Sequence, residues 1–204
     1  MFPFALLAIG IVLIFGISSS KSSTTKSSVP GTLNTPISGT KRILLIGDSL
    51  GVGLKSGLFA LANSQNIPFS SDTRNSTHIS EWARQNIAGV GYGWLAAALE
   101  KSKANIVFVS LGTNDTKVSG NTAEILLPNI LKLVSICNSF GARVFWLLPP
   151  NMPWDTSELK KALISANVST ILAPENLERA SDKVHSTPAG YNAWAGSIWT
   201  SLTG

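Results

Sequence analysis

RILLIGDSLG, residues 42–51, is the stretch from which the fold of this chain can be argued. Residues 42–46 are mainly apolar in a continuous rather than alternating run, which is typical of a strand covered on both faces. A short polar turn follows, and residues 52–63 have a helical pattern. A strand, a turn and a helix in this order predict an α/β fold.

The same alternation of strand and helix recurs through residues 41–204, which have the length of one domain. Apolar runs predict two further strong strands and two weaker ones, at 106–111, 143–148, 67–73 and 168–172. Helical patterns lie between them at 94–103, 122–140, 156–166 and 188–202. Strands that alternate with helices predict a parallel sheet with helices on both faces, a three-layer α/β/α sandwich.

Two segments precede this domain. Residues 1–17 carry no charged side chain and would reach about 25 Å as a helix, near the lower limit for a membrane span. They are expected to be a membrane anchor or a secretory signal. The lack of Lys or Arg before the apolar run and of an A-x-A-like site after it favours the anchor. Residues 18–40 are mostly Ser, Thr, Gly, Pro and Asn, which is typical of a flexible linker.

Charge and cysteine content argue against two kinds of site. The formal net charge is +5 with no block of five or more like charges, so nucleic-acid binding is not predicted. Cys137 is the single cysteine, which excludes an intrachain disulfide and a multi-cysteine metal site. It lies among apolar residues and is expected to be a buried thiol.

Ser49, where the first predicted strand has ended, allows three interpretations. It can cap the following helix, belong to a phosphate-binding loop, or act as a nucleophile. A P-loop would have Gly at position 52 and Lys at position 53, where this chain has Val52 and Gly53, so the second interpretation fails. The third requires a base.

The chain has two histidines, His78 and His185, and His185 follows Asp182 by three residues. A carboxylate on imidazole Nδ1–H fixes the tautomer and leaves Nε2 to take the proton of a serine hydroxyl. Donors for an oxyanion are expected from the amino end of the helix after Ser49 and from Asn114, at another strand end. In isolation, a solvated Asp–His pair and an Asn turn are the alternatives. Because the carboxyl ends of parallel strands share one edge, these groups are expected to meet there.

Three blocks together resemble the SGNH hydrolases, also called the GDSL family: GDSL at 47–50, GTND at 112–115 and DKVH at 182–185. The resemblance covers essentially all of residues 41–204. It implies the SGNH hydrolase fold, with a flavodoxin-like sheet. It also implies two-step ester hydrolysis through an acyl-enzyme, with no metal or organic cofactor.

Carried over residue by residue, the resemblance assigns Ser49 as the nucleophile and as a backbone oxyanion donor. Asn114 would be the side-chain oxyanion donor, His185 the base and Asp182 the carboxylate that orients it. The acidic residues next to Ser49 and Asn114 would hold their loops rather than react. These are Asp48 and Asp115.

The chain departs from the family in the second block. The family has a glycine on the loop after the second strand, and its N–H completes the oxyanion hole. This chain reads TRNSTHISEW at 73–82, without a glycine. We expect the N–H of Ser76 to take that place, with Gly89 or Gly91 as the alternative. His78, on the same loop, is expected to line the pocket or bind substrate.

The predicted function is a serine esterase for short acyl esters, acetyl above all, on cell-wall or surface polysaccharide. The alternatives are a lipid esterase, an O-acyltransferase, or a noncatalytic carbohydrate-binding or structural module. Possible sugar-stacking faces are Trp82, Trp146 and Trp154. The alternative, at least as well supported for Trp146, is that these large side chains anchor the core. Such a domain is expected outside the cytoplasm, membrane-anchored or secreted, although the lysines after residues 1–17 favour a cytoplasmic flank.

Overall fold

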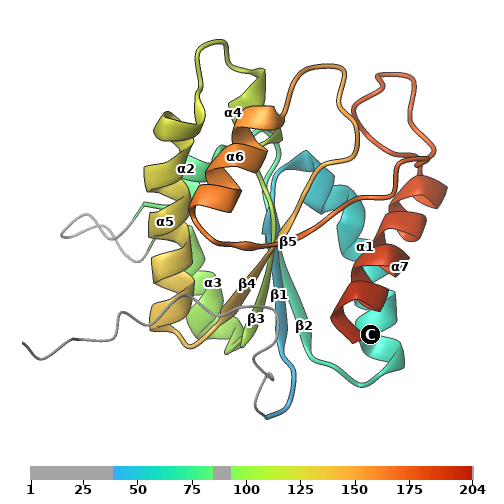
Figure 1. Ribbon diagram of the computed structural model, residues 1–204. Coiled ribbons are helices and arrows are strands. Elements are labelled where there is room, and N and C mark those ends of the chain that lie inside the picture. Colours follow the sequence, from blue (N-terminus) through green and yellow to red (C-terminus); the bar gives the residue numbers. More distant parts are fainter. Residues whose placement is uncertain (1–38, 85–92, 204) are drawn as a thin grey trace, which may run out of the picture.

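A computed structural model describes residues 39–84 and 93–203 of the chain (Figure 1). The predicted anchor at residues 1–17, nearly all of the predicted linker, and Gly89 and Gly91 lie outside the described residues. No helix in the described ranges is long and apolar enough to cross a membrane.

Five parallel strands form the sheet, in the order β2-β1-β3-β4-β5. The strands are β1 (Ile43–Gly47), β2 (Phe69–Thr73), β3 (Ile106–Ser110), β4 (Arg143–Leu147) and β5 (Ser169–Ile171). This is the flavodoxin-like order, so the expected α/β class and sheet are confirmed.

Within residues 39–84 and 93–203, seven helices connect and follow these strands. They are α1 (Ser49–Ser64), α2 (Ile79–Trp82), α3 (Trp94–Ser102), α4 (Thr113–Lys117), α5 (Ala123–Ser139), α6 (Ser157–Ser165) and α7 (Pro188–Thr203). The long helices and all strands lie within three residues of their predicted ends. The short helices α2 and α4 were not predicted, because an element of one turn has no hydrophobic period.

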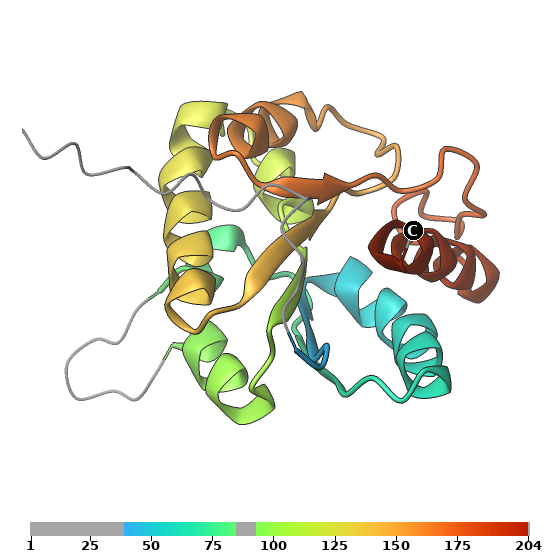
Figure 2. The ribbon, with the colours of Figure 1, turned by 60° about the horizontal axis from the view of Figure 1, so that its bottom comes forward.

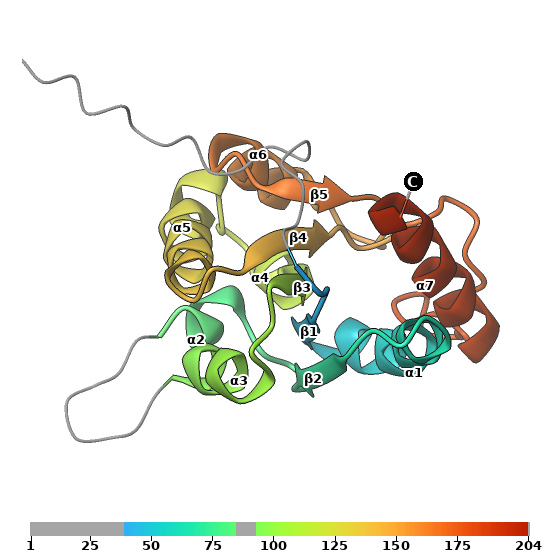
Figure 3. The same cartoon turned by 90° about the horizontal axis from the view of Figure 1, so that it is seen from below.

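The sheet is covered on both faces, as its continuous apolar strands require. Helices α1 and α7 pack on one face, against a cluster that includes Ile43 and Leu45. The other face carries α2, α3, α5 and α6, with Leu44 and Ile46 in their cluster. Figures 2 and 3 show these three layers from below. Neighbouring residues of β1 therefore belong to opposite cores.

Two glycines on α1 bring α7 close to it. A Cβ at Gly53 would lie 2.1 Å from the ring of Tyr191, and one at Gly57 would lie 2.8 Å from Cβ of Ala195. The two glycines are four residues apart and so share one face of the helix. The close approach places the loop before α7, which carries His185, beside the start of α1.

The core settles several predictions about single residues. Cys137 is fully buried, and burial raises the pKa of its thiol to about 12, so the expected buried thiol is confirmed. Trp82 and Trp146 are also fully buried. The prediction that they offer sugar-stacking faces is therefore wrong, because their large apolar rings fill the core instead. Trp154 remains half-buried.

Candidate active site

The expected polar segments meet at the carboxyl edge of the sheet, at the top of Figure 1. Strands β1 and β3 are neighbours there, and β1 continues into α1 on one face of the sheet. The chain after β3 continues through α4 into α5 on the other face. Such a switch point leaves a crevice outside the strand ends, where α/β proteins bind ligands. Ser49 follows the carboxyl end of β1, and Asn114 follows that of β3.

Ser49 is the first residue of α1 and not its cap. Asp48 is the N-cap: its backbone is extended, and its Oδ1 accepts a hydrogen bond of 2.9 Å from the N–H of Leu50. Of the three interpretations of Ser49, the helix cap is thus excluded, since the acidic neighbour takes that role. The Ser49 hydroxyl remains available for another partner, at the positive end of the helix dipole.

That partner is His185. Its Nε2 lies 2.9 Å from Ser49 Oγ, and its Nδ1 lies 2.6 Å from Asp182 Oδ2. The bond from His185 lowers the pKa of Asp182 to about 2, helped by two backbone N–H groups. The carboxylate is therefore ionised and only accepts, so Nδ1 carries the proton and donates it. Nε2 of the neutral ring is then the acceptor for the Ser49 hydroxyl.

The loop before α7 holds this histidine by a local network. Asp182 Oδ1 accepts from the N–H groups of Val184 and His185, both at 2.9 Å. Arg179 donates to the carbonyl of Val184 and, from its other end, to the carbonyl of Asn151. The side chain of His185 is thereby fixed from its own loop and from the loop after β4.

The loop after β2 carries Ser76, and its backbone there is unusual. Ser76 has a φ of 61°, in the left-handed region that favours glycine. This serine therefore occupies a backbone conformation that suits the family's missing glycine. Asn114 Nδ2 donates to the carbonyl of Thr77 at 3.0 Å, and its second hydrogen is not used by that bond.

Two buried carboxyl groups hold the loops around the site, as expected. Asp115 accepts from the N–H of Ile79, with both oxygens at 3.2 Å, and Asp48 caps α1. Burial raises the pKa of both groups, that of Asp48 to about 7. His78 Nδ1 lies 3.8 Å from Asp115 Oδ1.

A surface depression of about 500 Å³ lies over the Ser49 hydroxyl, open to solvent. Its lining residues are Ser49, Val52, Gly53, Asn75, Ser76, His185 and Tyr191. His78 is not among them, so the expectation that it lines the pocket is not met; it faces Asp115 instead. Sequence reasoning missed Tyr191, although it follows His185 by six residues and the glycine that its ring contacts, Gly53, follows Ser49 by four.

No group of three or more His, Cys, Asp or Glu side chains in the described residues is arranged to hold a metal ion. This edge brings together a serine hydroxyl, an imidazole in contact with it and a carboxylate on the far side of that imidazole. Such a set performs nucleophilic attack on a carbonyl carbon.

No family model and no curated protein matches the sequence. Among solved structures, the chain is similar to an acetyl esterase mutant with an acetate ion, at 15% identity and a TM-score of 0.61 over 80% of this chain and 97% of that one. It is similar to the psychrotrophic esterase EstA from Pseudoalteromonas sp., at 16% identity and 0.60 over 79% and 96%. It is also similar to a carbohydrate esterase family 3 protein from Talaromyces cellulolyticus, at 15% and 0.59 over 80% and 97%. The chain has the SGNH hydrolase fold.

Proposed function

We propose that this protein is a serine esterase that hydrolyses short acyl esters through an acyl-enzyme on Ser49. The observation that carries the proposal is the position of His185, which contacts Ser49 Oγ with one ring nitrogen and Asp182 with the other. A helix cap or a solvated surface pair requires no such bridge between residues 136 positions apart.

In the proposed first step, Ser49 Oγ attacks the acyl carbon while its proton moves to His185 Nε2. Asp182 stabilises the imidazolium that forms, because its carboxylate already accepts the Nδ1–H. The imidazolium then gives its proton to the departing alkoxide as the ester C–O bond breaks. Asp182, with its pKa of about 2, stays ionised throughout.

The oxyanion of the tetrahedral intermediate would receive three donors. Ser49 offers its backbone N–H at the first turn of α1, and Ser76 offers its own N–H from the left-handed turn. Asn114 offers its second Nδ2 hydrogen from the end of β3. Fixed donors of this kind act mainly on the charge that develops in the transition state, and therefore on kcat.

In the second step, water attacks the acyl carbon and gives a proton to His185 Nε2. The bond from the acyl carbon to Ser49 Oγ then breaks, the imidazolium returns its proton to Oγ, and the acid is released. A carbohydrate hydroxyl in place of water would make the same chemistry a transfer. The depression over Ser49 is open to solvent, which favours water as the acceptor.

A short acyl group suits the depression best. Its walls near Ser49 are Val52, Gly53 and Tyr191, and the ring of Tyr191 lies directly against the backbone of Gly53. Two neighbours of similar fold are an acetyl esterase and a carbohydrate esterase. We therefore propose acetyl esters of polysaccharide as the substrate class. An esterase for such substrates would act outside the cytoplasm, with residues 1–17 as its membrane anchor or secretory signal.

The test compares the full-length protein with Ser49→Ala, His185→Ala and the control Ser56→Ala, an exposed serine on the same helix. Rates are measured on 4-nitrophenyl esters of two to ten carbons, together with acetate release from acetylated xylan. We expect acetyl to be the fastest ester, and each active-site variant to lose about 10⁴-fold to 10⁶-fold in kcat. A serine-directed phosphonate should label the Ser49 peptide.

The proposal fails if the parent protein neither hydrolyses these esters nor reacts with the phosphonate. Activity that survives Ser49→Ala would remove Ser49 as the nucleophile. A preference for esters of eight or more carbons would replace the substrate class with lipid esters.

A further inference from the structure

The side chain of Arg74, directly after β2, is held by three partners. Its guanidinium makes a bidentate ion pair with Asp72, with both N···O distances at 3.0 Å. Its Cζ lies 3.9 Å from the ring centroid of Trp94 and 5.7 Å from that of Trp82. The two indoles in turn meet edge to face at 5.7 Å. The guanidinium plane is therefore fixed in orientation as well as in position.

The backbone of Arg74 begins the loop that carries Ser76. Its N–H donates to the carbonyl of Gly47 at 2.8 Å, two residues before Ser49. Its own carbonyl accepts from Thr77 Oγ1 at 2.9 Å, and Thr77 Oγ1 in turn accepts from Trp82 Nε1 at 3.1 Å. Residues 74–77 thus form a turn closed by these bonds, and Ser76 within it has a φ of 61°.

Trp82 joins the side-chain and backbone networks. Its indole N–H is bonded to Thr77, and its ring lies beside the Arg74 guanidinium. A displacement of Arg74 therefore acts on the turn from both ends: through its own backbone and through the indole that holds Thr77. The carbonyl of Thr77 is also the acceptor for Asn114. Two of the three proposed oxyanion donors depend on this one turn.

We infer that Arg74 is a positioning residue for the oxyanion hole. It touches no reacting atom, and it fixes the turn that aims the Ser76 N–H and anchors Asn114. The inference rests on the proposed esterase function. It accounts for the missing glycine: a clamped serine holds the left-handed backbone that glycine would adopt freely.

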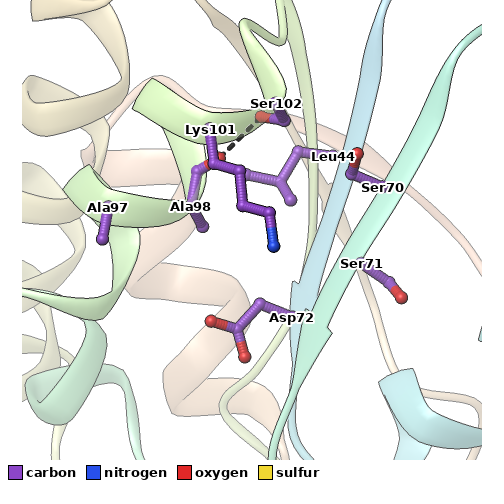
Figure 4. Close-up of a pocket in the computed structure, with 8 residues that line it drawn as sticks. All are labelled: Leu44, Ser70, Ser71, Asp72, Ala97, Ala98, Lys101 and Ser102. Atoms are coloured by element: carbon purple, nitrogen blue, oxygen red, sulfur yellow. Dashed lines mark hydrogen bonds between the residues drawn. The ribbon is translucent and has the colours of Figure 1, made fainter.

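The chain offers a matched control on the other side of Asp72. Figure 4 shows the Asp72 carboxylate and the Lys101 ammonium pointing into one cavity, of about 390 Å³, between β2 and α3. Lys101 is an exposed cation near the same carboxylate, but it belongs to α3 and not to the turn. Its removal changes the charge around Asp72 and leaves the turn's own hydrogen bonds in place.

The experiment measures kcat, KM and the pH profile of full-length Arg74→Ala, Arg74→Lys and Lys101→Ala, with kcat expressed per site titrated by phosphonate. We expect Arg74→Ala to lose about 10-fold to 100-fold in kcat, since a misplaced donor acts mainly in the transition state. KM should stay within about threefold, and the pH profile should keep its shape because His185 is untouched. Lys101→Ala should match the parent protein.

Arg74→Lys keeps the charge but has no planar fork for Asp72 and Trp94 together, so we expect it to recover only part of kcat. A variant that merely unfolds would lose titrated sites and not turnover per site. Unchanged kcat per site in Arg74→Ala overturns the inference, and so does full recovery in Arg74→Lys.

A second measurement is independent of esterase activity. NMR order parameters of the Ser76 and Thr77 amides should fall in Arg74→Ala and stay at the parent value in Lys101→Ala. If the parent protein is inactive on esters, the proposed function fails while this result still decides whether Arg74 holds the turn. Unchanged order parameters overturn the inference in either case.

Discussion

The proposed site has an acid–base half, made of side chains, and an oxyanion half, made mainly of backbone N–H groups. The acid–base half consists of three side chains, Ser49, His185 and Asp182, joined by hydrogen bonds of 2.9 and 2.6 Å. The oxyanion half consists of two backbone N–H groups and one amide, and it depends on the left-handed turn at Ser76. The acid–base half depends on which side chains are present. The oxyanion half depends mainly on the backbone conformation, which many sequences can adopt. Mutations should therefore act on the two halves by different rules.

The largest effect we predict outside Ser49 and His185 is that of Asp182→Asn. An asparagine amide donates to His185 Nδ1, so the proton of the neutral ring moves to Nε2, which can no longer accept from Ser49. We expect kcat to fall by about 10⁴-fold near pH 7, with little change in the free energy of unfolding. Steady-state kinetics and urea unfolding of the same samples measure the two quantities.

Asp155→Asn is the matched control for that prediction. Asp155 also caps a short turn, through bonds to the backbone and hydroxyl of Ser157, and it has no contact with His185 among the hydrogen bonds of the described residues. Its activity should equal that of the parent protein. A loss of less than tenfold in Asp182→Asn would show that the orientation of His185 does not depend on this carboxylate.

The next largest effect is that of Asn114→Ala, which changes the side-chain donor of the oxyanion half. Asn114→Ala removes the proposed amide donor and the bond to the Thr77 carbonyl together. We expect kcat to fall by about 10²-fold to 10³-fold, as for the loss of one oxyanion donor. Phosphonate titration should still count one reactive Ser49 per chain, because the acid–base half stays assembled. Loss of the titrated sites would show that Asn114 is needed to assemble the site, and would contradict its role as an oxyanion donor.

Variants of Ser76 test whether a backbone N–H donor works equally well with different side chains on the same residue. Ser76→Ala should keep kcat within about threefold, whereas Ser76→Pro removes the N–H and forces φ to about −65°, so we expect a loss of about 10²-fold. Ser76→Gly should keep the activity and raise the free energy of unfolding by at most about 1 kcal/mol, because glycine adopts positive φ without steric cost. Equal activity of the Pro and Ala variants would exclude the Ser76 N–H from the oxyanion hole.

The comparison also explains which features could be read from the sequence. The apolar runs at residues 42–46 and 106–111 predicted buried parallel strands because nothing but a two-sided core suits them. The pair Asp182 and His185 was identifiable because the chain has one other histidine. The structure brings these residues to Ser49, and their catalytic roles stay predictions.

Other features depend on contacts that no local pattern carries. Helix α2 has only four residues. Its first N–H, that of Ile79, donates to the carboxylate of Asp115, which lies 36 positions away in the sequence. The turn at Ser76 depends on Arg74, Thr77 and Trp82 together. Trp82 itself was expected near substrate, since composition alone does not distinguish a core indole from an exposed one.

The last predicted effect is on stability and not on activity, and it comes from Asp48, the residue that precedes Ser49. Burial raises its pKa in the folded protein to about 7, against 3.8 for the free side chain. Between these values the folded state holds a proton that the unfolded state has lost, so the stability of the parent protein falls as pH rises from about 4 to 7. Asp48→Asn removes this loss and keeps an oxygen to accept from Leu50.

The free energy of unfolding of Asp48→Asn should therefore be close to that of the parent protein at pH 4. It should exceed the parent value by the full amount above pH 7. Three pKa units correspond to roughly 4 kcal/mol of unfolding free energy. This value is an upper bound, because water can reach the carboxyl when the protein opens locally. Urea unfolding at pH 4.5 and pH 8 measures the difference. Asp155→Asn should show no such difference between the two pH values, because hydrogen bonds from Ser157 lower the pKa of that exposed carboxyl below 3.8, and it is ionised at both. If Asp48→Asn is stabilised equally at both pH values, the carboxyl is not protonated in the folded protein, and the α1 cap beside Ser49 carries a buried charge.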